Sequence, residues 1–233
     1  MTSSEIDQLV RRLIVQLLLW SAITGGLLFT GAGTLRWTEG WLFLGLWFAT
    51  GLASSLALAR DNPAILEERM RPPRQSTHKG WDKPILAAIL IGWAALHFVA
   101  GVDAVRWRWS NNPASIEVAG AALMLAGFYG MHRALRENAY AAPIVKIDAE
   151  RGHRVIDTGP YAVVRHPMYA GAVLYLLGTA LLLGSWMALA IGAALSCLLA
   201  LRAVWEEDAL KAELPGYAAY AERVRFRIVP EVW

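Results

Sequence analysis

The chain alternates long apolar stretches with short polar ones. Four stretches approach the roughly 20 helical residues that cross the hydrocarbon core of a membrane, namely 13–31, 41–59, 85–102 and 116–131. A fifth stretch, 168–204, is long enough for two helices, and Gly184-Ser185 near its middle predicts a tight turn between them. The pattern therefore predicts an all-α integral membrane protein with about six transmembrane helices, or five plus a helical hairpin whose first arm is short.

Composition agrees with this prediction, since 56% of the residues are hydrophobic and 11 are tryptophan. The fourth apolar stretch also contains Gly120 and Gly127, small residues that let helices approach closely in lipid. We divide the chain into residues 1–132, with four spans, and residues 133–233, which hold a polar segment, the hairpin and a basic C-terminal segment.

The basic residues are distributed unevenly over the predicted loops. Of the 22 lysines and arginines, only Arg36, Arg106 and Arg108 fall in the loops on one side, and the positive-inside rule makes the opposite, basic side cytoplasmic. Both termini then face the cytoplasm, with six spans or with five and a hairpin. The net charge of +3 requires no nucleic-acid partner, and the chain lacks the interleaved aromatic and basic residues of single-strand binders.

Cysteine and histidine usage argues against a metal site. Cys197 is the only cysteine, which excludes an internal disulfide and a cysteine-rich metal cluster, and its apolar neighbours predict a buried, inert thiol. His97 has no second histidine or carboxylate at helical ligand spacing, so we interpret it as a packing residue.

The segment 60–83 is rich in proline and charge and leads into the third apolar stretch. Within it, 66–71 is typical of a short amphipathic helix. We interpret the segment as a solvated connector attracted to anionic lipids, with headgroup binding or a lid over a pocket as alternatives.

The segment 158–171, Thr-Gly-Pro-Tyr-Ala-Val-Val-Arg-His-Pro-Met-Tyr-Ala-Gly, is the most unusual polar stretch of the chain. Its Gly-Pro and His-Pro pairs are turn signals, and such backbone is tolerated at membrane depth only where it lines a cavity or is buried in protein. Pro167 predicts the first turn of a helix, whose free N–H groups suit a carboxylate. His166 and Tyr169 then lie close together. Alternatively, Arg165 and Tyr169 are interfacial anchors and His166 is an N-cap.

A second polar group, Arg202, Glu206, Glu207 and Asp208, follows the last apolar stretch. Arg202 and Glu206 are four residues apart, so an ion pair within the helix is the simplest interpretation. A ligand site is the alternative, in which the glutamates hold an ammonium group and Arg202 reaches a carboxylate or an anionic transition state. Glu207 points away from the Arg202 face of a straight helix. We expect the basic segment 223–230 to pack back onto this site.

Five motifs stand in the second half of the chain: Gly159-Pro160-Tyr161, Arg165-His166-Pro167-x-Tyr169-x-Gly171, Arg202 … Glu206-Glu207, Gly216-Tyr217-x-x-Tyr220 and Arg227-Ile228-Val229-Pro230. Together they resemble the isoprenylcysteine carboxyl methyltransferase family, which has phospholipid N-methyltransferase and small-thiol methyltransferase relatives. The resemblance extends over roughly 138–233. It is specific for the family and does not identify the methyl acceptor.

The resemblance implies an integral membrane enzyme that uses S-adenosylmethionine, bound in a cytoplasm-facing pocket formed by the C-terminal half. By position, the cofactor-binding residues are Gly159, Pro160, Tyr161, Val164, Arg165, His166, Tyr169 and Glu206. Glu206 is expected to hold the amino-acid part of the cofactor, and Arg202 and Glu207 are expected to be catalytic residues that face the acceptor. Lys146 stands near a position where some members contact the cofactor. No metal is implied.

The expected function is methyl transfer to a lipophilic acceptor that enters from the bilayer. An isoprenylcysteine-type carboxylate is the first expectation, and a lipid amine or a small thiol stays open. Two other classes remain: a sterol-type membrane reductase that uses NADPH and shares a similar Arg-His-Pro-x-Tyr segment, and a non-catalytic lipid-binding protein. The absence of a dinucleotide-binding glycine fingerprint agrees with a pocket built from helix ends and loops. Membrane lipids are the other expected partners.

Overall fold

The structure, a computed structural model, describes residues 3–61, 65–66, 79–141, 143–145 and 152–233. Most of the predicted helix at 66–71, and Lys146, lie outside these residues. The described residues contain no β-strand, which confirms the all-α prediction. In chain order the elements are α1 (Ser3–Ala32), α2 (Thr38–Asp61), α4 (Asp82–Gly101), the π-helical η1 (Val102–Trp107), α5 (Ala114–Glu137), the 3-10 turn η3 (Gly159–Ala162), α6 (Pro167–Leu182), α7 (Trp186–Glu213) and α8 (Tyr217–Arg223).

Five of these helices are long and apolar enough to cross a membrane: α1, α2, α4 with its continuation η1, α5 and α7. Helix α6 has only 16 residues. The fifth apolar stretch therefore forms the predicted helical hairpin with a short first arm, rather than two complete spans. Its turn lies at the predicted Gly184-Ser185, where Gly184 has a φ of +72°, a left-handed conformation that glycine adopts without steric strain.

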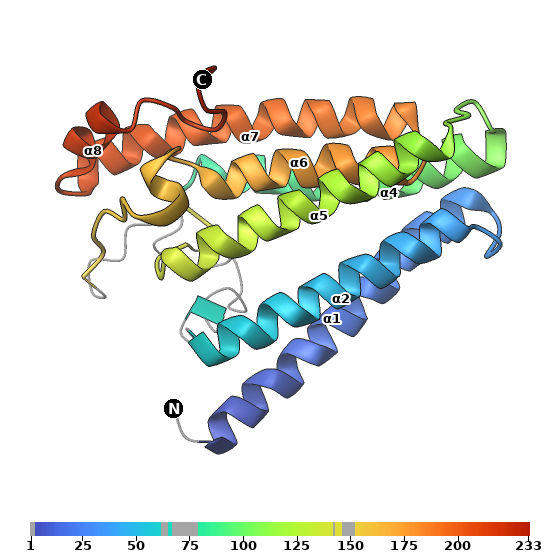
Figure 1. Cartoon of the computed structure of the whole chain (residues 1–233), viewed down its shortest axis with the longest axis horizontal. Coiled ribbons are helices and arrows are strands. Elements are labelled where there is room, and N and C mark those ends of the chain that lie inside the picture. The colour runs from blue at the N-terminus through green and yellow to red at the C-terminus, as the bar shows by residue number, and fades with distance from the viewer. Residues whose placement is uncertain (1–2, 62–64, 67–78, 142, 146–151) are drawn as a thin grey trace.

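The helices lie alongside one another, so the turns gather at two opposite ends of the molecule (Figure 1). The turns that follow α1, η1 and α6 lie at one end. At the other end, which we call the α8 end, α5 and α7 finish, α4 and α6 begin, and α8 follows (Figure 1). Helix α5 packs along α6, and α4 contacts both α1 and α7. The α8 end is therefore where the polar motifs of the second half of the chain meet.

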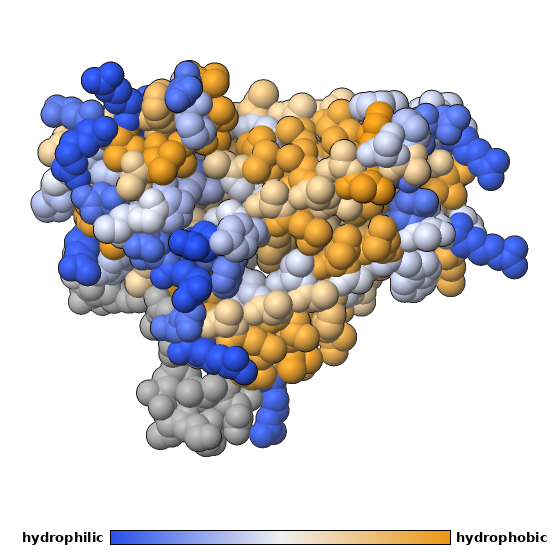
Figure 2. Space-filling view, in the orientation of Figure 1, coloured by the Kyte–Doolittle hydropathy of each residue, from blue (hydrophilic) through white to orange (hydrophobic). Residues whose placement is uncertain are grey.

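Apolar side chains cover the middle of the molecule, and hydrophilic side chains gather toward its two ends (Figure 2). This distribution agrees with helices that face lipid. Cys197 of α7 is exposed, so the prediction of a buried thiol is wrong. The reason is that lipid and protein core are both apolar, and apolar neighbours therefore do not distinguish the two faces of a membrane helix.

Small residues bring α5 and α6 into backbone contact, as the glycines of the fourth stretch predicted. A Cβ atom added at Gly127 would lie 2.5 Å from the carbonyl oxygen of Gly171. A Cβ atom added at Gly171 would lie 2.7 Å from the carbonyl oxygen of Gly127. The two helices thus leave no room for a side chain at either position, and this contact fixes where α6 begins relative to α5.

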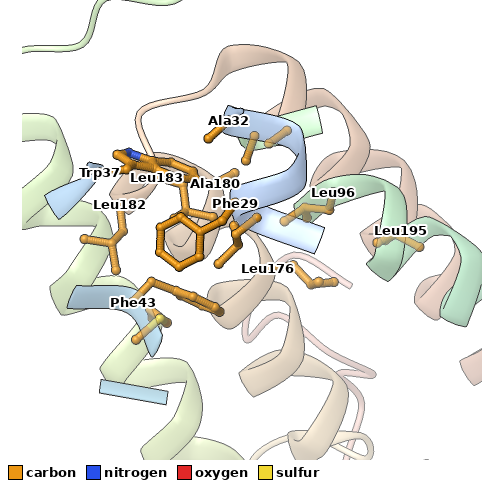
Figure 3. Close-up of a cluster of buried hydrophobic side chains, with 14 of the residues drawn as sticks. Phe29, Ala32, Trp37, Phe43, Leu96, Leu176, Ala180, Leu182, Leu183 and Leu195 are labelled. Carbon is orange, nitrogen blue, oxygen red and sulfur yellow. The ribbon is translucent and has the colours of Figure 1, made fainter. Parts of the chain in front are cut away.

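The main buried cluster joins the first helices to the hairpin of α6 and α7 (Figure 3). Phe29 of α1 and Phe43 of α2 pack in the same cluster as Leu96 of α4, Leu176 of α6 and Leu195 of α7. Because lipid tails are as apolar as leucine, such a cluster holds helices together by close packing rather than by exclusion of water. The cluster therefore fixes the positions of α4, α6 and α7 relative to one another.

The start of α7 is fixed by the buried carboxylate of Asp103, which lies in η1. Its Oδ2 atom accepts hydrogen bonds from the hydroxyls of Ser110 and Ser185, at 2.7 and 2.5 Å, and from the backbone N–H of Met187 at 3.2 Å. A negative charge is favourable at the N-terminus of a helix. This network lies at the end of the molecule opposite the α8 end, so it anchors α7 away from the polar motifs.

Candidate active site

A cavity of about 280 Å³ opens at the α8 end of the molecule. Its wall comes from the segments 138–141, 143–145 and 153–156, from the segment that leads into α6, from α7 and from α8. The predicted site residues that line it are Tyr161, Arg165, His166, Tyr169, Arg202 and Glu206. The fold therefore brings the two polar groups of the sequence together around one space.

The segment before α6 is shaped by its glycine and prolines. Gly159 has a φ of +56° and opens the turn η3. Helix α6 begins at Pro167, as predicted, and His166 occupies the N-cap position without a hydrogen bond from its side chain to the helix. His166 is therefore the N-cap residue, as the alternative interpretation predicted, although its ring does not cap the helix. The imidazole instead stacks parallel to the ring of Tyr169, with centroids 5.3 Å apart.

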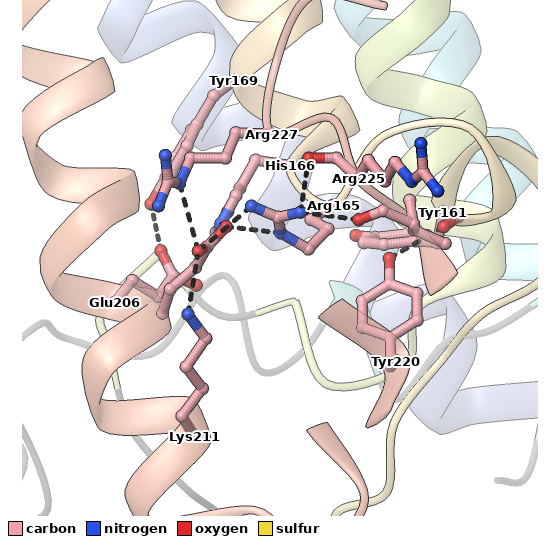
Figure 4. A network of polar contacts seen from close by, with 11 residues as sticks. Tyr161, Arg165, His166, Tyr169, Glu206, Lys211, Tyr220, Arg225 and Arg227 are labelled. Carbon is pink, nitrogen blue, oxygen red and sulfur yellow. Dashed lines mark hydrogen bonds and ion pairs between the residues drawn. The ribbon is translucent and has the colours of Figure 1, made fainter. Parts of the chain in front are cut away.

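Arg165 lies in the protein interior rather than at the membrane interface. Its Nε and Nη2 atoms donate to the two carboxylate oxygens of Glu207, at 2.6 and 3.2 Å. Its Nη1 atom donates to the backbone carbonyls of Val224 and Arg225, at 2.6 and 2.8 Å (Figure 4). Because its side chain is only 6% exposed, the alternative in which Arg165 is an interfacial anchor is wrong.

Glu207 is the centre of a buried group of charges. Its side chain is 1% exposed, and besides Arg165 it accepts a hydrogen bond from Nε of Arg227 at 3.1 Å. Nε2 of His166 lies 3.3 Å away and Nζ of Lys211 lies 3.8 Å away. Glu207 is absent from the cavity wall among the described residues. Its predicted position facing a methyl acceptor remains a prediction, and its contacts are those of a structural counter-ion.

Glu206, the neighbour of Glu207, does line the cavity. Its Oε2 atom accepts a hydrogen bond of 2.5 Å from the hydroxyl of Tyr169 (Figure 4). Successive residues of a helix point about 100° apart. The side chains of the two adjacent glutamates therefore enter different environments. The Glu207 carboxylate is committed to Arg165 and Arg227, and the Glu206 carboxylate is presented to the cavity.

Arg202 is held by a residue far away in the sequence. Its Nε and Nη2 atoms donate to Oδ1 and Oδ2 of Asp82, at 2.7 and 3.0 Å, and Nη2 also donates to the carbonyl of Pro143 at 2.9 Å. This pair replaces the predicted ion pair between Arg202 and Glu206, which is therefore wrong. The guanidinium also lies 5.7 Å from the ring centroid of Tyr169, within the range of a cation–π contact.

Asp82 is the site residue that the sequence did not reveal. It lies in the first turn of α4 and is completely buried. An acidic residue at the beginning of a helix is common because it complements the helix dipole, so its position alone carries no signal of a site. Only the packing of α4 against α7 brings it to Arg202.

The C-terminal segment packs onto the site, as predicted. The backbone N–H groups of Arg165 and His166 donate to the carbonyls of Phe226 and Arg227, at 2.9 and 2.8 Å. The hydroxyl of Tyr220 donates to the carbonyl of Tyr161 at 2.8 Å. These contacts from α8 and the C-terminal segment fix the backbone before α6.

Several predicted site residues do not line the cavity. Gly159, Pro160 and Val164 belong to the segment that precedes α6, but they are not part of the cavity wall among the described residues. Their cofactor contacts remain predictions, as does that of Lys146. The same described residues contain no group of three or more histidine, cysteine, aspartate or glutamate side chains arranged to hold a metal ion.

Comparison with known proteins relates part of the chain to a known protein family. Residues 115–214 match the family described as phospholipid methyltransferase. The matched region extends from α5 to the end of α7 and includes the motif before α6, Arg202 and both glutamates, but it excludes Asp82 and the C-terminal segment. No curated protein matched the chain. The match and the five long apolar helices together indicate an integral membrane methyltransferase.

Proposed function

We propose that the protein transfers a methyl group from S-adenosylmethionine to a lipophilic acceptor that enters from the bilayer. One observation carries this proposal: His166, Tyr169, Arg202 and Glu206 surround a single cavity, and all four lie within the region that matches a methyltransferase family. A cavity at the polar α8 end suits a soluble donor, and its apolar wall residues suit a lipophilic acceptor.

The cavity wall has the chemistry that this cofactor requires. The carboxylate of Glu206 can accept hydrogen bonds from an ammonium group, and the hydroxyl of Tyr169 holds that carboxylate in place. Apolar side chains, among them Ile144, Val155 and Leu210, line other parts of the same cavity and suit a purine ring. The residues present therefore fit the zwitterionic and aromatic parts of S-adenosylmethionine.

The chemistry places few demands on the protein beyond alignment. The bound cofactor supplies a methyl group made electrophilic by the sulfonium, and direct transfer needs no covalent intermediate on the protein. Aligning the two reactants provides a large part of the rate enhancement in such reactions. In this proposal the Tyr169–Glu206 pair holds the donor, and the guanidinium of Arg202 orients a polar or anionic nucleophile.

Two acceptor classes follow from different observations. The permanent positive charge of Arg202 at the cavity suits a carboxylate, and we propose an isoprenylcysteine-type carboxylate as the acceptor. The match to phospholipid methyltransferases favours a lipid amine as the second candidate.

The proposed reaction is tested with purified protein in liposomes and S-adenosylmethionine carrying a radiolabelled methyl group. Prenylcysteine, phosphatidylethanolamine and small thiols are compared as acceptors, and label in the lipid fraction with the first is the expected result. Calorimetric titration with S-adenosylhomocysteine and NADPH tests the class of enzyme. Binding of NADPH without binding of S-adenosylhomocysteine would contradict the proposal.

The division of roles within the site has its own test. His166→Ala is expected to abolish binding of S-adenosylhomocysteine, because it removes the ring that stacks on Tyr169 beside the donor site. Arg202→Ala is expected to retain binding and lose turnover. An equal loss of binding in both variants would contradict this division.

We also propose that the α8 end faces the cytoplasm, where soluble cofactor is available. Arg133 and Arg136 at the end of α5, and Lys211 and Arg223 near the end of the chain, lie at this end, as the positive-inside rule requires. Labelling of intact cells with a membrane-impermeant thiol reagent tests this, using a Cys197→Ser chain with single cysteines introduced at Glu222 or Arg36. Only the cysteine at Arg36 is expected to react.

A further inference from the structure

The carboxylate of Asp82 is shared by two parts of the cavity wall that are distant in sequence. It accepts two hydrogen bonds from Arg202 of α7, at 2.7 and 3.0 Å. It also accepts one from the backbone N–H of Val145, at 3.0 Å. Arg202 and Val145 both line the cavity. A single buried carboxylate therefore determines where a charged side chain and a stretch of wall backbone stand.

The backbone around Val145 is held from both sides. Its carbonyl accepts a hydrogen bond from the backbone N–H of Lys79 at 3.3 Å, and Lys79 in turn accepts one from the N–H of Asp82 at 3.1 Å. The carbonyl of Pro143 accepts the second bond from Nη2 of Arg202. The start of α4, the segment 143–145 and Arg202 thus form one connected unit.

This arrangement leaves the Nη1 atom of Arg202 available to a ligand. Nε and Nη2 of Arg202 are occupied by Asp82 and Pro143, whereas Nη1 has no hydrogen-bond partner among the residues that the structure describes. Because the guanidinium group is a rigid planar fork, fixing the edge formed by Nε and Nη2 also fixes the direction of Nη1. The orientation of that donor is therefore set by Asp82.

We propose that Asp82 is a positioning residue of the active site, which holds Arg202 so that Nη1 meets the methyl acceptor. The inference rests on the proposed function and adds to it a residue outside the matched region 115–214. The first half of the chain, in this view, completes a site whose recognisable motifs all lie in the second half. Asp82 acts through Arg202 and through the wall at 143–145, and it does not touch the donor.

The kinetic test compares Asp82→Asn with Asp103→Asn, a matched control. Both residues are buried aspartates whose carboxylates accept hydrogen bonds from side chains and from a backbone N–H, but Asp103 lies at the opposite end of the molecule (Figure 1). Asp82→Asn is expected to lower kcat/KM for the acceptor at least tenfold, with the Kd of S-adenosylhomocysteine changed less than threefold. Asp103→Asn is expected to lower the Tm without a comparable loss of kcat/KM. Equal kinetic losses in the two variants would overturn the proposal.

A double-mutant cycle separates positioning from a general loss of stability. Residues that act as one unit show non-additive effects. In an Arg202→Lys background, which lacks the planar fork, Asp82→Asn is expected to lower kcat/KM by less than twofold further. Full additivity of the two losses would overturn the proposal. If Asp82→Asn does not fold, Asp82→Glu replaces it, because that variant keeps the charge but displaces the guanidinium.

A measurement on the unliganded protein tests the position of Arg202 without requiring turnover. In full-length protein labelled at arginine side chains with ¹⁵N, the Nε–H signal of Arg202 is expected to exchange slowly, with Arg202→Lys providing its assignment. The signal should shift and exchange rapidly in Asp82→Asn and stay unchanged in Asp103→Asn. A rapidly exchanging signal in the wild type would overturn the positioning role. Failure of the wild type to transfer methyl groups would instead refute the proposed function.

Discussion

Arg165 and Glu207 form a two-point ion pair, with N–O distances of 2.6 and 3.2 Å, between side chains that are 6% and 1% exposed. The pair joins the segment before α6 to α7, and Arg227 adds the C-terminal segment to the same carboxylate. Buried charges of this kind are costly when one partner is lost, because the remaining charge stays shielded from water. The pair therefore links the stability of the α8 end to the shape of the cavity.

Replacing Glu207 by glutamine should destabilise the protein strongly. The substitution leaves Arg165 buried without a counter-ion, which typically costs about 3–5 kcal/mol. We expect a clearly lower Tm in scanning calorimetry of the detergent-solubilised protein. Glu206→Gln is the matched control, and it should keep the Tm while weakening the binding of S-adenosylhomocysteine. A wild-type Tm for Glu207→Gln would show that the ion pair does not hold the α8 end together.

The two tyrosines of α8 should respond differently to loss of the hydroxyl. The hydroxyl of Tyr220 donates to the carbonyl of Tyr161, so Tyr220→Phe removes a buried hydrogen bond and should cost about 0.5–1.5 kcal/mol. The hydroxyl of Tyr217 is buried and has no partner among the described residues, so Tyr217→Phe should be neutral or stabilising.

Burial, together with the negative charges of Glu207 and Glu206, raises the pKa of Tyr217. Tyr217 therefore remains neutral at physiological pH, and Tyr217→Phe differs from the wild type by the hydroxyl alone. The Tm values of the two variants, measured side by side, test the difference. The same decrease in both would indicate that Tyr217 has a partner of equal strength.

The contact between α5 and α6 should tolerate no added methyl group at its centre. Gly127→Ala places a Cβ atom against the backbone of Gly171 and should cost about 1–3 kcal/mol, because the two helices must separate. Gly130→Ala is the control on the same helix, since its nearest neighbour lies 3.7 Å from the added atom. Unfolding in mixed detergent measures both. Equal stabilities would mean that the helices separate at little cost.

The start of α7 should contribute to stability without affecting ligand binding. Ser185 accepts a hydrogen bond from the N–H of Ala188 as the N-cap of α7, and it donates to Asp103. Ser185→Ala should cost about 1 kcal/mol, the usual value of an N-cap. Ser196→Ala, which removes a hydroxyl bonded to the carbonyl of Gly192 four residues earlier, should be nearly neutral. The Kd of S-adenosylhomocysteine should stay at the wild-type value in both.

Much of the candidate site could be located from the sequence. The proline at position 167 predicted the start of α6, because proline suits the first turn of a helix, where no N–H donor is needed. The spacing of His166 and Tyr169 predicted their proximity, and their rings do stack. These inferences succeeded because they depend on a few consecutive residues, whose conformation local sterics and hydrogen bonding largely determine.

Long-range partners could not be predicted in this way. The four-residue spacing of Arg202 and Glu206 favoured an ion pair within the helix, but the partner of Arg202 is Asp82, 120 residues earlier. The helical period alone did not show that Glu207 would be buried among cations while Glu206 lines the cavity. The partner of each side chain on α7 depends on which element packs against the face of the helix that carries it.

The sequence by itself determined that this is an all-α membrane protein, since the length of an apolar stretch sets whether a helix can span the bilayer. It also determined the turn at Gly184-Ser185 and the segment that begins α6. Only the tertiary structure decided that Cys197 is exposed and that Asp82 holds Arg202. The physical reason is that lengths and turns are properties of a local segment, whereas burial and pairing arise from the packing of one helix against another, and the lipid-facing and buried surfaces of a membrane helix share the same apolar pattern.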